Sequence, residues 1–166
     1  IDLVAEGVDL ALRVSSVDLP PTLIVRPLSE IVFYLVGETE YLQRHGTPST
    51  PQEIPAYNFV QASYVDMEHI KISRDSEHFT LAPNSTIRAD NTLMVREMVL
   101  AGGGLGCLPV WTVKRDLDSG RLVRLLPEWR ILSATLYAAY ADRAFLSAKI
   151  RSFIDFLVEK IKQEAV

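Results

Sequence analysis

The sequence predicts an α/β fold, because segments with the two-residue period of strands alternate with segments that have the helical period. The clearest example runs from 86 to 108. A strand end is followed by three residues that can cap a helix (90–92), by a mostly apolar helix, by a triple glycine (102–104) and by a short apolar strand. This is one βαβ unit. Units of this kind imply a largely parallel sheet.

The helix of this unit, starting at Thr92 and ending before Gly102, has few polar residues apart from Arg96 and Glu97, so we expect it to be mostly buried. Its first amides have no partner inside the helix, and the helix dipole places partial positive charge there. A carboxylate or phosphate could therefore be held at this end. Alternatively, the side chain of Asn91 caps its own helix, which is the commoner use of such a residue.

The other elements follow from the same two periods, with glycine and proline as terminators. A strand at 8–14 is expected to have at least one well-buried face, and 70–73 and 78–81 are expected to pair as a hairpin outside the main sheet. The expected elements are a helix tail at 1–6, strands at 8–14, 23–28, 31–36, 59–62, 70–73, 78–81, 105–108, 122–126 and 134–141, and helices at 40–45, 50–54, 92–101, 109–117 and from 147 on.

Several details of these elements can be checked. The strands at 23–28 and 31–36 are expected to form one long crossing segment, and Thr50 to Glu53 has the pattern of a capping box whose helix is ended by Pro55. Apolar side chains at helical spacings are expected in the core. They include Met94, Met98, Trp111, Phe153 and Phe156.

Composition narrows the class of protein. The net charge of −4 and the pI near 5.4 argue against broad nucleic-acid binding by these 166 residues. The lone Cys107 allows no internal disulfide and is expected to be a buried, inert thiol. The longest charge-free apolar stretch, 98–111, contains four glycines and a proline and is too short to span a bilayer. Without a recognisable signal peptide, the sequence favours a cytoplasmic protein with no membrane partner.

Motifs for catalysis and cofactors are weak. Gly102, Gly104 and Cys107 miss the dinucleotide-binding pattern at its last glycine, and they follow a helix rather than a strand. The sequence has neither a P-loop nor a G-x-S-x-G elbow. The three histidines, 45, 69 and 78, lack metal-ligand spacing and a nearby nucleophile. We therefore expect no catalytic residue, no metal and no cofactor.

An ordered set of short segments covers nearly the whole chain and resembles the effector-binding domain of LysR-type transcriptional regulators. The segments are DLVAEGVDLALRV at 2–14, YLQRHGTP at 41–48, TPQEI at 50–54, Asp-Asn at 90–91, AGGGLGCLP at 101–109, GRLV at 120–123 and FIDFL at 153–157. The resemblance implies a two-lobed fold, similar to type 2 periplasmic binding proteins, in which the chain crosses between the lobes twice, near 28–30 and 129–133.

On this sequence, residues 1–29 and 131–166 would form regulatory lobe I, and residues 30–130 would form regulatory lobe II. Family members carry a winged helix-turn-helix and the first strand and helix of lobe I upstream of the segment that matches Ile1. We therefore expect an upstream segment in the parent protein and an incomplete first lobe here, with 8–14 as an exposed edge strand. DNA would be bound only through the upstream domain, and a homodimer or tetramer is implied.

The resemblance also places a small effector in the cleft between the lobes, in agreement with the rule that ligands bind beyond the carboxyl ends of strands. Arg13 is the natural counter-charge for an anionic effector, although such arginines often pair with surface carboxylates instead. Two alternatives stay open, a solute-binding protein of a transport system and an enzyme on the same fold. The candidate effector-binding residues are Arg13, Ser15, Ser16, Gln61, Ser63, Asn91, Thr92, Leu105 and Gly106.

Overall fold

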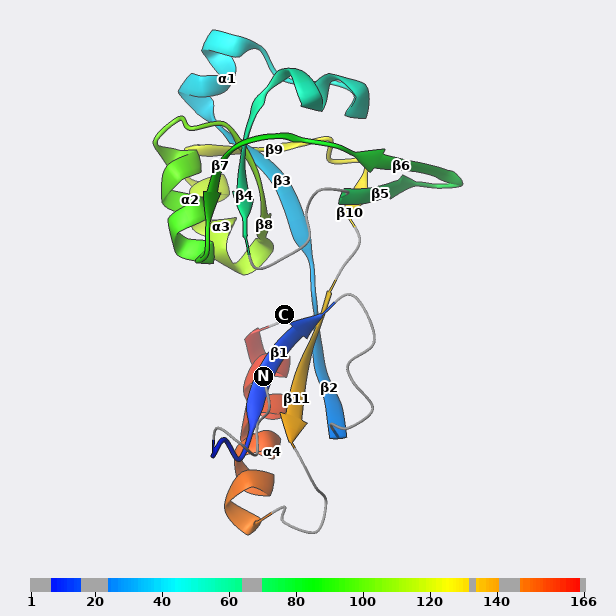
Figure 1. Ribbon diagram of the computed structural model, residues 1–166, viewed down its shortest axis with the longest axis vertical. Helices are drawn as coiled ribbons and strands as arrows, with labels where there is room; N and C mark the ends of the chain where they lie inside the picture. The colour runs from blue at the N-terminus through cyan, green and yellow to red at the C-terminus, as the bar shows by residue number, and fades with distance from the viewer. Residues whose placement is uncertain (1–6, 16–23, 64–69, 132–133, 141–146, 165–166) are drawn as a thin grey trace. The chain divides into compact units, whose positions relative to one another are not determined.

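The computed structural model describes residues 7–15, 24–63, 70–131, 134–140 and 147–164, and the chain divides into two compact units (Figure 1). One unit comprises 1–31 and 133–166, and the other comprises 32–132. The helix tail predicted at 1–6 lies outside the described residues. Strand β2 (Ile24–Ile31) and strand β3 (Phe33–Glu38) are separated only by Val32, so the predicted crossing segment is confirmed.

The larger unit is built on a five-stranded sheet in the order β7-β4-β8-β3-β9. Strand β4 is parallel to both β7 and β8, whereas β3 is antiparallel to β8 and to β9. The predicted parallel sheet is therefore confirmed for this unit, with β3 as the exception. The other strands are β4 (Asn58–Ala62), β7 (Asn84–Ala89), β8 (Leu105–Pro109) and β9 (Leu122–Leu125).

Helices cover both faces of this sheet, because its buried strands alternate apolar side chains between two cores. On one face, α2 (Thr92–Leu100) and α3 (Val110–Asp118) pack through Val95, Val99 and Val113. On the other, α1 (Thr39–His45) and the 3₁₀ helix η1 (Pro51–Ala56) pack against the second core. The unit β7-α2-β8 crosses over β4, which pairs with both of its strands, so the predicted βαβ unit is confirmed.

The expectation that α2 is mostly buried is wrong. Only Val95 and Val99 are buried, whereas Leu93 is 58% exposed and Met94 is 51% exposed. A helix lying on one face of a sheet buries a single stripe, and these two residues fall outside that stripe. For the same reason Trp111, Phe153 and Phe156 are exposed rather than in the core, while Met98 packs partly against it.

The segment after Thr50 is a 3₁₀ helix instead of an α-helix, and Pro55 lies inside it rather than at its end. The Thr50 side chain makes no capping hydrogen bond, so the predicted capping box does not form as such, although Glu53 does reach back to the residues at the start of the helix. The Glu53 carboxylate accepts hydrogen bonds from the Ser49 amide at 2.9 Å and from the hydroxyls of Ser49 and Thr50, each at 3.1 Å. These hydrogen bonds, with that of the Ser49 amide first, lower the pKa of Glu53.

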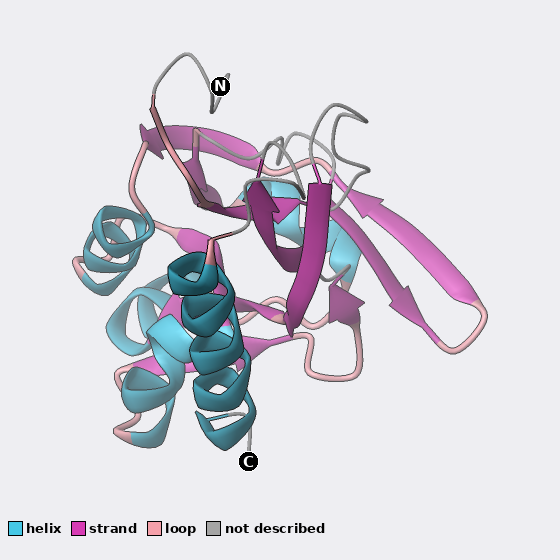
Figure 2. Cartoon of the chain, turned by 90° about the horizontal axis from the view of Figure 1, so that it is seen from below, coloured by secondary structure: helices cyan, strands magenta, loops and turns pink. Residues whose placement is uncertain are grey.

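The predicted hairpin is confirmed. Strands β5 (Ile70–Arg74) and β6 (Glu77–Leu81) pair antiparallel, and β10 (Arg130–Ile131) adds to β5 in a sheet separate from the main one. Figure 2 shows the hairpin as a two-stranded projection. Its turn contains Asp75 at a positive φ of 50°.

In the smaller unit, the residues that the structure describes form a three-stranded sheet of β1 (Ala11–Ser15), β11 (Ala134–Tyr140) and β2, in the order β1-β11-β2. Both pairings are antiparallel, so the prediction of a parallel sheet fails here. Helix α4 (Ala148–Glu164) packs Ile150 and Ile154 against Ala138. As predicted, Ser147 caps it, accepting from the Ile150 amide at 3.3 Å.

Strand β1 lies at an edge of this sheet and lacks the well-buried face that its alternation predicts. Leu12 is 49% exposed and Val14 is 52% exposed. The core under α4 includes Leu10 and Leu28 but stops short of these two residues. Among the residues that the structure describes, nothing covers the apolar side chains of this edge strand.

Gly104 provides a test of the turn between α2 and β8. Its φ is +142°, and a Cβ there would overlap the carbonyl oxygen of Asn58. We predict that Gly104→Ala lowers the free energy of unfolding by roughly 3 kcal/mol or more. Gly120→Ala is the control, since Gly120 has a φ of +73° but no atom within 4 Å of the position that a Cβ would occupy, and should cost only about 1 kcal/mol. Urea denaturation would measure both, and equal losses would contradict this interpretation.

Cys107 is confirmed as a buried thiol, and burial raises its pKa from 9.0 to about 12. Above pH 9 the unfolded chain loses the thiol proton while the folded chain keeps it, so stability should fall as pH rises through this window. We predict a loss near pH 10 that is about 1.4 kcal/mol larger than in Cys107→Ala. Denaturation curves at about pH 8 and about pH 10 would test this, and parallel losses in both proteins would contradict it.

Candidate functional site

Polar residues gather at the carboxyl edge of the five-stranded sheet. Because β4 and β7 are parallel, the residues that follow them emerge at the same edge. Ser63 follows β4, and its amide donates to the carbonyl oxygen of Ala89 at the end of β7, at 2.8 Å. This bond extends the strand pairing by one step and brings Ser63 beside the segment that leads into α2. The structure therefore brings together the predicted site residues Ser63, Asn91 and Thr92.

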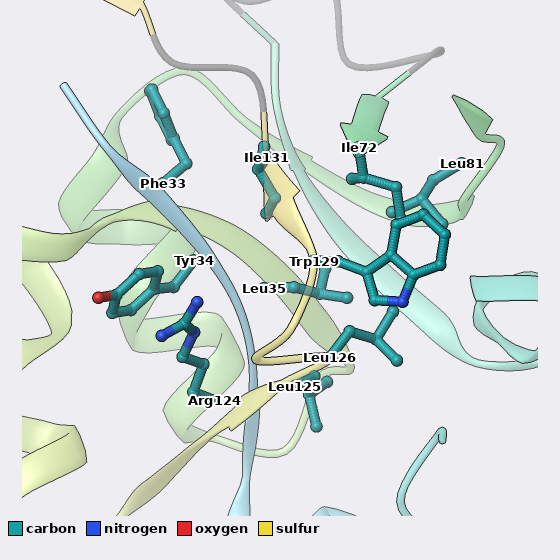
Figure 3. A pocket seen from close by; sticks show the side chains of 10 residues that line it. All are labelled: Phe33, Tyr34, Leu35, Ile72, Leu81, Arg124, Leu125, Leu126, Trp129 and Ile131. Atoms are coloured by element: carbon teal, nitrogen blue, oxygen red, sulfur yellow. The ribbon is translucent and has the colours of Figure 1, made fainter. Parts of the chain in front are cut away.

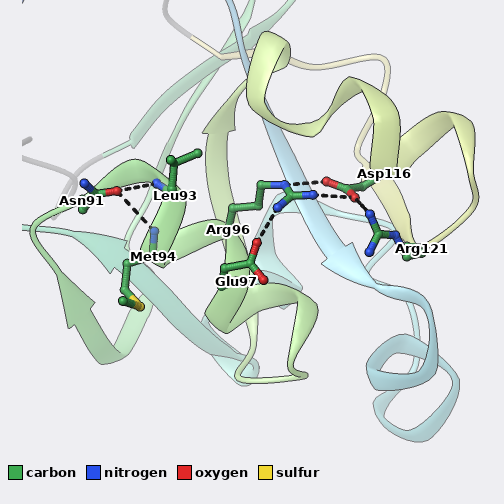
Figure 4. A network of polar contacts seen from close by, with 7 residues as sticks. All are labelled: Asn91, Leu93, Met94, Arg96, Glu97, Asp116 and Arg121. Atoms are coloured by element: carbon green, nitrogen blue, oxygen red, sulfur yellow. Dashed lines mark hydrogen bonds and ion pairs between the residues drawn. The ribbon is translucent and has the colours of Figure 1, made fainter.

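Asn91 is the N-cap of α2. Its Oδ1 accepts hydrogen bonds from the amide of Leu93 at 2.8 Å and from the amide of Met94 at 3.4 Å (Figure 4). The capping interpretation is thus correct, and two of the amides considered for an anion are already bonded. The side-chain NH₂ of Asn91 is not used by the cap, and both Asn91 and Leu93 are exposed. A ligand at this helix end would meet an amide donor and the positive end of the dipole.

Gln61 lies in β4 one residue before its end and is only 3% exposed. Its Oε1 accepts a hydrogen bond from the hydroxyl of Ser85 in β7. The side-chain oxygen therefore serves to tie the two strands together. Gln61 supports the edge from within the sheet.

Leu105 and Gly106 are not brought to this edge. Both are buried at the start of β8, where they pair with Phe59 and Val60 near the start of β4. The glycine turn returns the chain to the amino end of the sheet, so the residues directly after it lie at the far end of a parallel strand. In β8, the residue at the carboxyl end is Pro109.

The remaining candidates belong to the smaller unit. Arg13 lies in β1 opposite Tyr137, is half-buried, and forms no ion pair with the residues that the structure describes. Ser15 ends β1 opposite Thr135, and Ser16 lies outside the described residues. Arg13 thus offers the cationic group that the anionic-effector hypothesis requires.

The apolar pocket in Figure 3 is not a metabolite site. Its lining includes Leu35, Ile72 and Trp129, and its volume is about 10 Å³, the space of a single water molecule. At its margin, the guanidinium carbon of Arg124 lies 4.0 Å from the centre of the Tyr34 ring. This pocket is a small packing void between the two sheets of the larger unit.

Within the described ranges, no group of three or more His, Cys, Asp or Glu residues is placed to hold a metal ion. Nor does this part of the chain contain a helix long and apolar enough to cross a bilayer.

Residues 1–162 match the family described as the LysR substrate binding domain. The chain belongs to this family. The probable HTH-type transcriptional regulator LtrA of Klebsiella pneumoniae is 31% identical over 97% of this chain and 53% of its own length. The HTH-type transcriptional activator TtdR of Escherichia coli is 28% identical over 98% of this chain and 53% of its own length. The LysR-family chain therefore spans about half the length of these curated relatives.

Solved structures agree with this family membership. The regulatory domain of CrgA, a LysR-type transcriptional regulator from Neisseria meningitidis, superposes with a TM-score of 0.81 at 27% identity, covering 96% of this chain and 78% of that one. Full-length AphB of Vibrio cholerae gives a TM-score of 0.80 at 23% identity over 96% of this chain and 54% of that one, a likeness of fold. The predicted two-lobed, periplasmic-binding-protein-like α/β fold of LysR-type regulatory domains is confirmed.

A charge cluster around a buried carboxylate, which the sequence did not reveal, joins α2 to α3. Asp116 of α3 is fully buried, and its carboxylate accepts from Arg96 of α2 at 2.6 Å (Nε) and 2.8 Å (Nη2) (Figure 4). Arg121 bonds the same carboxylate, and Glu97 bonds Arg96. The hydrogen bond to Asp116 raises the pKa of Arg96. The sequence signal for this cluster was an arginine on a mostly apolar helix, but its partner Asp116 lies 20 residues away in the chain.

Removing the Asp116 carboxylate should leave Arg96 and Arg121 without the partner that they share. We predict that Asp116→Ala lowers the free energy of unfolding by about 3–5 kcal/mol, because Arg96, whose side chain is only 19% exposed, loses its buried partner. Glu97→Ala should cost at most about 1 kcal/mol, since the Glu97 side chain is 62% exposed. Thermal or chemical denaturation of both variants would decide, and losses of similar size would contradict a structural role for Asp116.

Proposed function

We propose that this chain is the ligand-sensing regulatory domain of a LysR-type transcriptional regulator. The observation that carries the proposal is the match of nearly the whole chain to the LysR substrate-binding domain. The likeness to the CrgA regulatory domain supports it. In this proposal, residues 1–29 and 131–166 form lobe I, residues 30–130 form lobe II, and a small effector binds in the cleft between them.

Two groups on the described residues fit an anionic effector. The positive end of α2 carries the exposed Asn91 amide beside Ser63, and Arg13 provides a cation from the other lobe. An effector that contacts both lobes favours the conformation in which both contacts are made, and so shifts the population toward it. No bond is made or broken in this process, and no cofactor takes part.

The rest of the regulator completes the mechanism. DNA is bound by a helix-turn-helix domain elsewhere in the parent protein, which is cytoplasmic and acts as a homodimer or tetramer. The effector-dependent change in the relative angle of the lobes alters the spacing of the DNA-binding domains in that oligomer. This chain alone, with its net charge of −4, contributes no broad DNA-binding surface.

The charge of the effector can be tested by substituting one residue without losing the helix cap. Aspartate caps a helix as well as asparagine does, so Asn91→Asp should fold normally while placing a negative charge where we propose that an anion binds. A screen of small carboxylates and aromatic metabolites by thermal shift would identify an effector for the unmodified protein. We predict that Asn91→Asp then weakens binding of this effector at least tenfold.

Two further variants complete this test. Asn91→Ala removes the cap and should cost about 1 kcal/mol of stability, so its effect on binding can be compared with that of the better-folded Asn91→Asp. Thr80→Val, on the exposed face of the hairpin, serves as a control that should bind normally. Unchanged affinity in Asn91→Asp would show that an anion does not bind at this end of α2.

A further inference from the structure

A groove separate from the proposed effector site lies within the larger unit, away from the start of α2. Residues 49–52, at the beginning of η1, form one side, and hairpin residues 74 and 77–79 form the other. Trp129, which is 8% exposed, completes the lining. The groove has a volume of about 430 Å³, within the range of small-molecule sites. The proposed interlobe site uses none of these residues.

Apart from the imidazole of His78, the lining of the groove contains one cation, Arg74, and one anion, Glu77, which are paired with each other. The guanidinium of Arg74 donates to Oε2 of Glu77 from Nη2 at 2.7 Å and from Nε at 3.2 Å. Their side chains are 42% and 59% exposed, and an ion pair this exposed contributes at most about 1 kcal/mol. The pair can therefore open at little cost when a ligand offers replacements for both partners.

Arg74 is also held independently of Glu77. Its guanidinium carbon lies 4.7 Å from the centre of the Trp129 ring, in a cation–π contact. Opening the ion pair would thus leave the guanidinium stacked on Trp129, with donors still available for another carboxylate. The half-buried Phe79 and the buried Pro51 add apolar surface beside these charged groups.

We propose that this groove binds a small zwitterion of the amino-acid class, with an apolar side chain. The carboxylate of the ligand would pair with Arg74, its ammonium group would pair with Glu77, and its apolar side chain would pack against Phe79 and Trp129. A ligand with only a carboxylate would leave Glu77 without a partner, and one with only an ammonium group would leave Arg74 without its carboxylate. The groove therefore selects for both charges together.

Trp129 would connect a bound ligand to other segments of the larger unit. Trp129 directly precedes β10, in which Arg130 pairs with Ser73 of β5. A ligand in the groove would touch the start of η1, the hairpin and the residue that leads into β10. It would hold three segments together that are far apart in the sequence. This inference goes beyond the proposed effector site, and either can fail without the other.

Fluorescence of Trp129 provides a local readout. The chain contains two tryptophans, and the other, Trp111, is 68% exposed on α3. In Trp111→Phe, Trp129 is the only tryptophan, and its emission reports on the groove. We expect L-phenylalanine to change this emission saturably, and to bind at least tenfold more tightly than 3-phenylpropionate, which lacks the ammonium group, or 2-phenylethylamine, which lacks the carboxylate.

Charge variants in the Trp111→Phe protein locate the binding. Glu77→Gln should weaken L-phenylalanine at least tenfold while leaving thermal stability nearly unchanged, because this ion pair is exposed. The matched control is Asp75→Asn, which removes a nearby acid outside the groove lining at a position with a φ of 50° that asparagine also adopts. It should bind L-phenylalanine normally.

Three results would each overturn the proposal. They are the absence of a saturable change with L-phenylalanine, similar affinities for all three probes, and unchanged affinity in Glu77→Gln. A failure here leaves the interlobe proposal standing, because that proposal is tested with different residues and by thermal shift. A failure of Asn91→Asp to alter effector binding likewise leaves the groove proposal intact.

Discussion

Helix α2 approaches the five-stranded sheet so closely that no side chain fits between them at Gly106, where a Cβ would lie 2.7 Å from Cγ2 of Val99. At Gly103 a Cβ would lie 2.9 Å from the carbonyl oxygen of Met98. The packing of the Val99 side chain against the backbone at Gly106 sets the height of α2 over β8, and the buried Asp116 carboxylate holds α2 against α3. Together they determine where the start of α2 emerges at the sheet edge.

The edge that results differs in one chemical respect from a bare helix terminus. The Asn91 side-chain oxygen already accepts hydrogen bonds from two backbone amides at this end of α2. A ligand would therefore meet the side-chain NH₂ of Asn91 and the positive end of the helix dipole. Ser63 joins this edge only because its amide extends the pairing of β4 with β7. The arrangement suits recognition by polar contacts in a member of the LysR family and provides a physical basis for the sensing role that we propose.

Local patterns predicted most of the elements, because periodicity, caps and glycine stops act within a few residues. They predicted β7, α2 and β8 in order, the separate hairpin and the Ser147 cap. They failed where the outcome depends on distant partners: Leu12 and Val14 are apolar yet exposed, and Asp116 pairs with an arginine from another helix. At the candidate site, parallel pairing brings Ser63 to Asn91 but leaves Leu105 at the opposite end of its strand.

Strand β3 constrains how this chain can change in length during evolution. Side chains alternate between the two faces of a strand, so one residue inserted or deleted inside β3, ahead of Leu35, would reverse the facing of the side chains that follow it relative to β8 and β9. Leu35 and Val36, which belong to opposite cores, would exchange places. The turn at 75–76, by contrast, lies at the tip of a hairpin, where added residues would leave both registers intact.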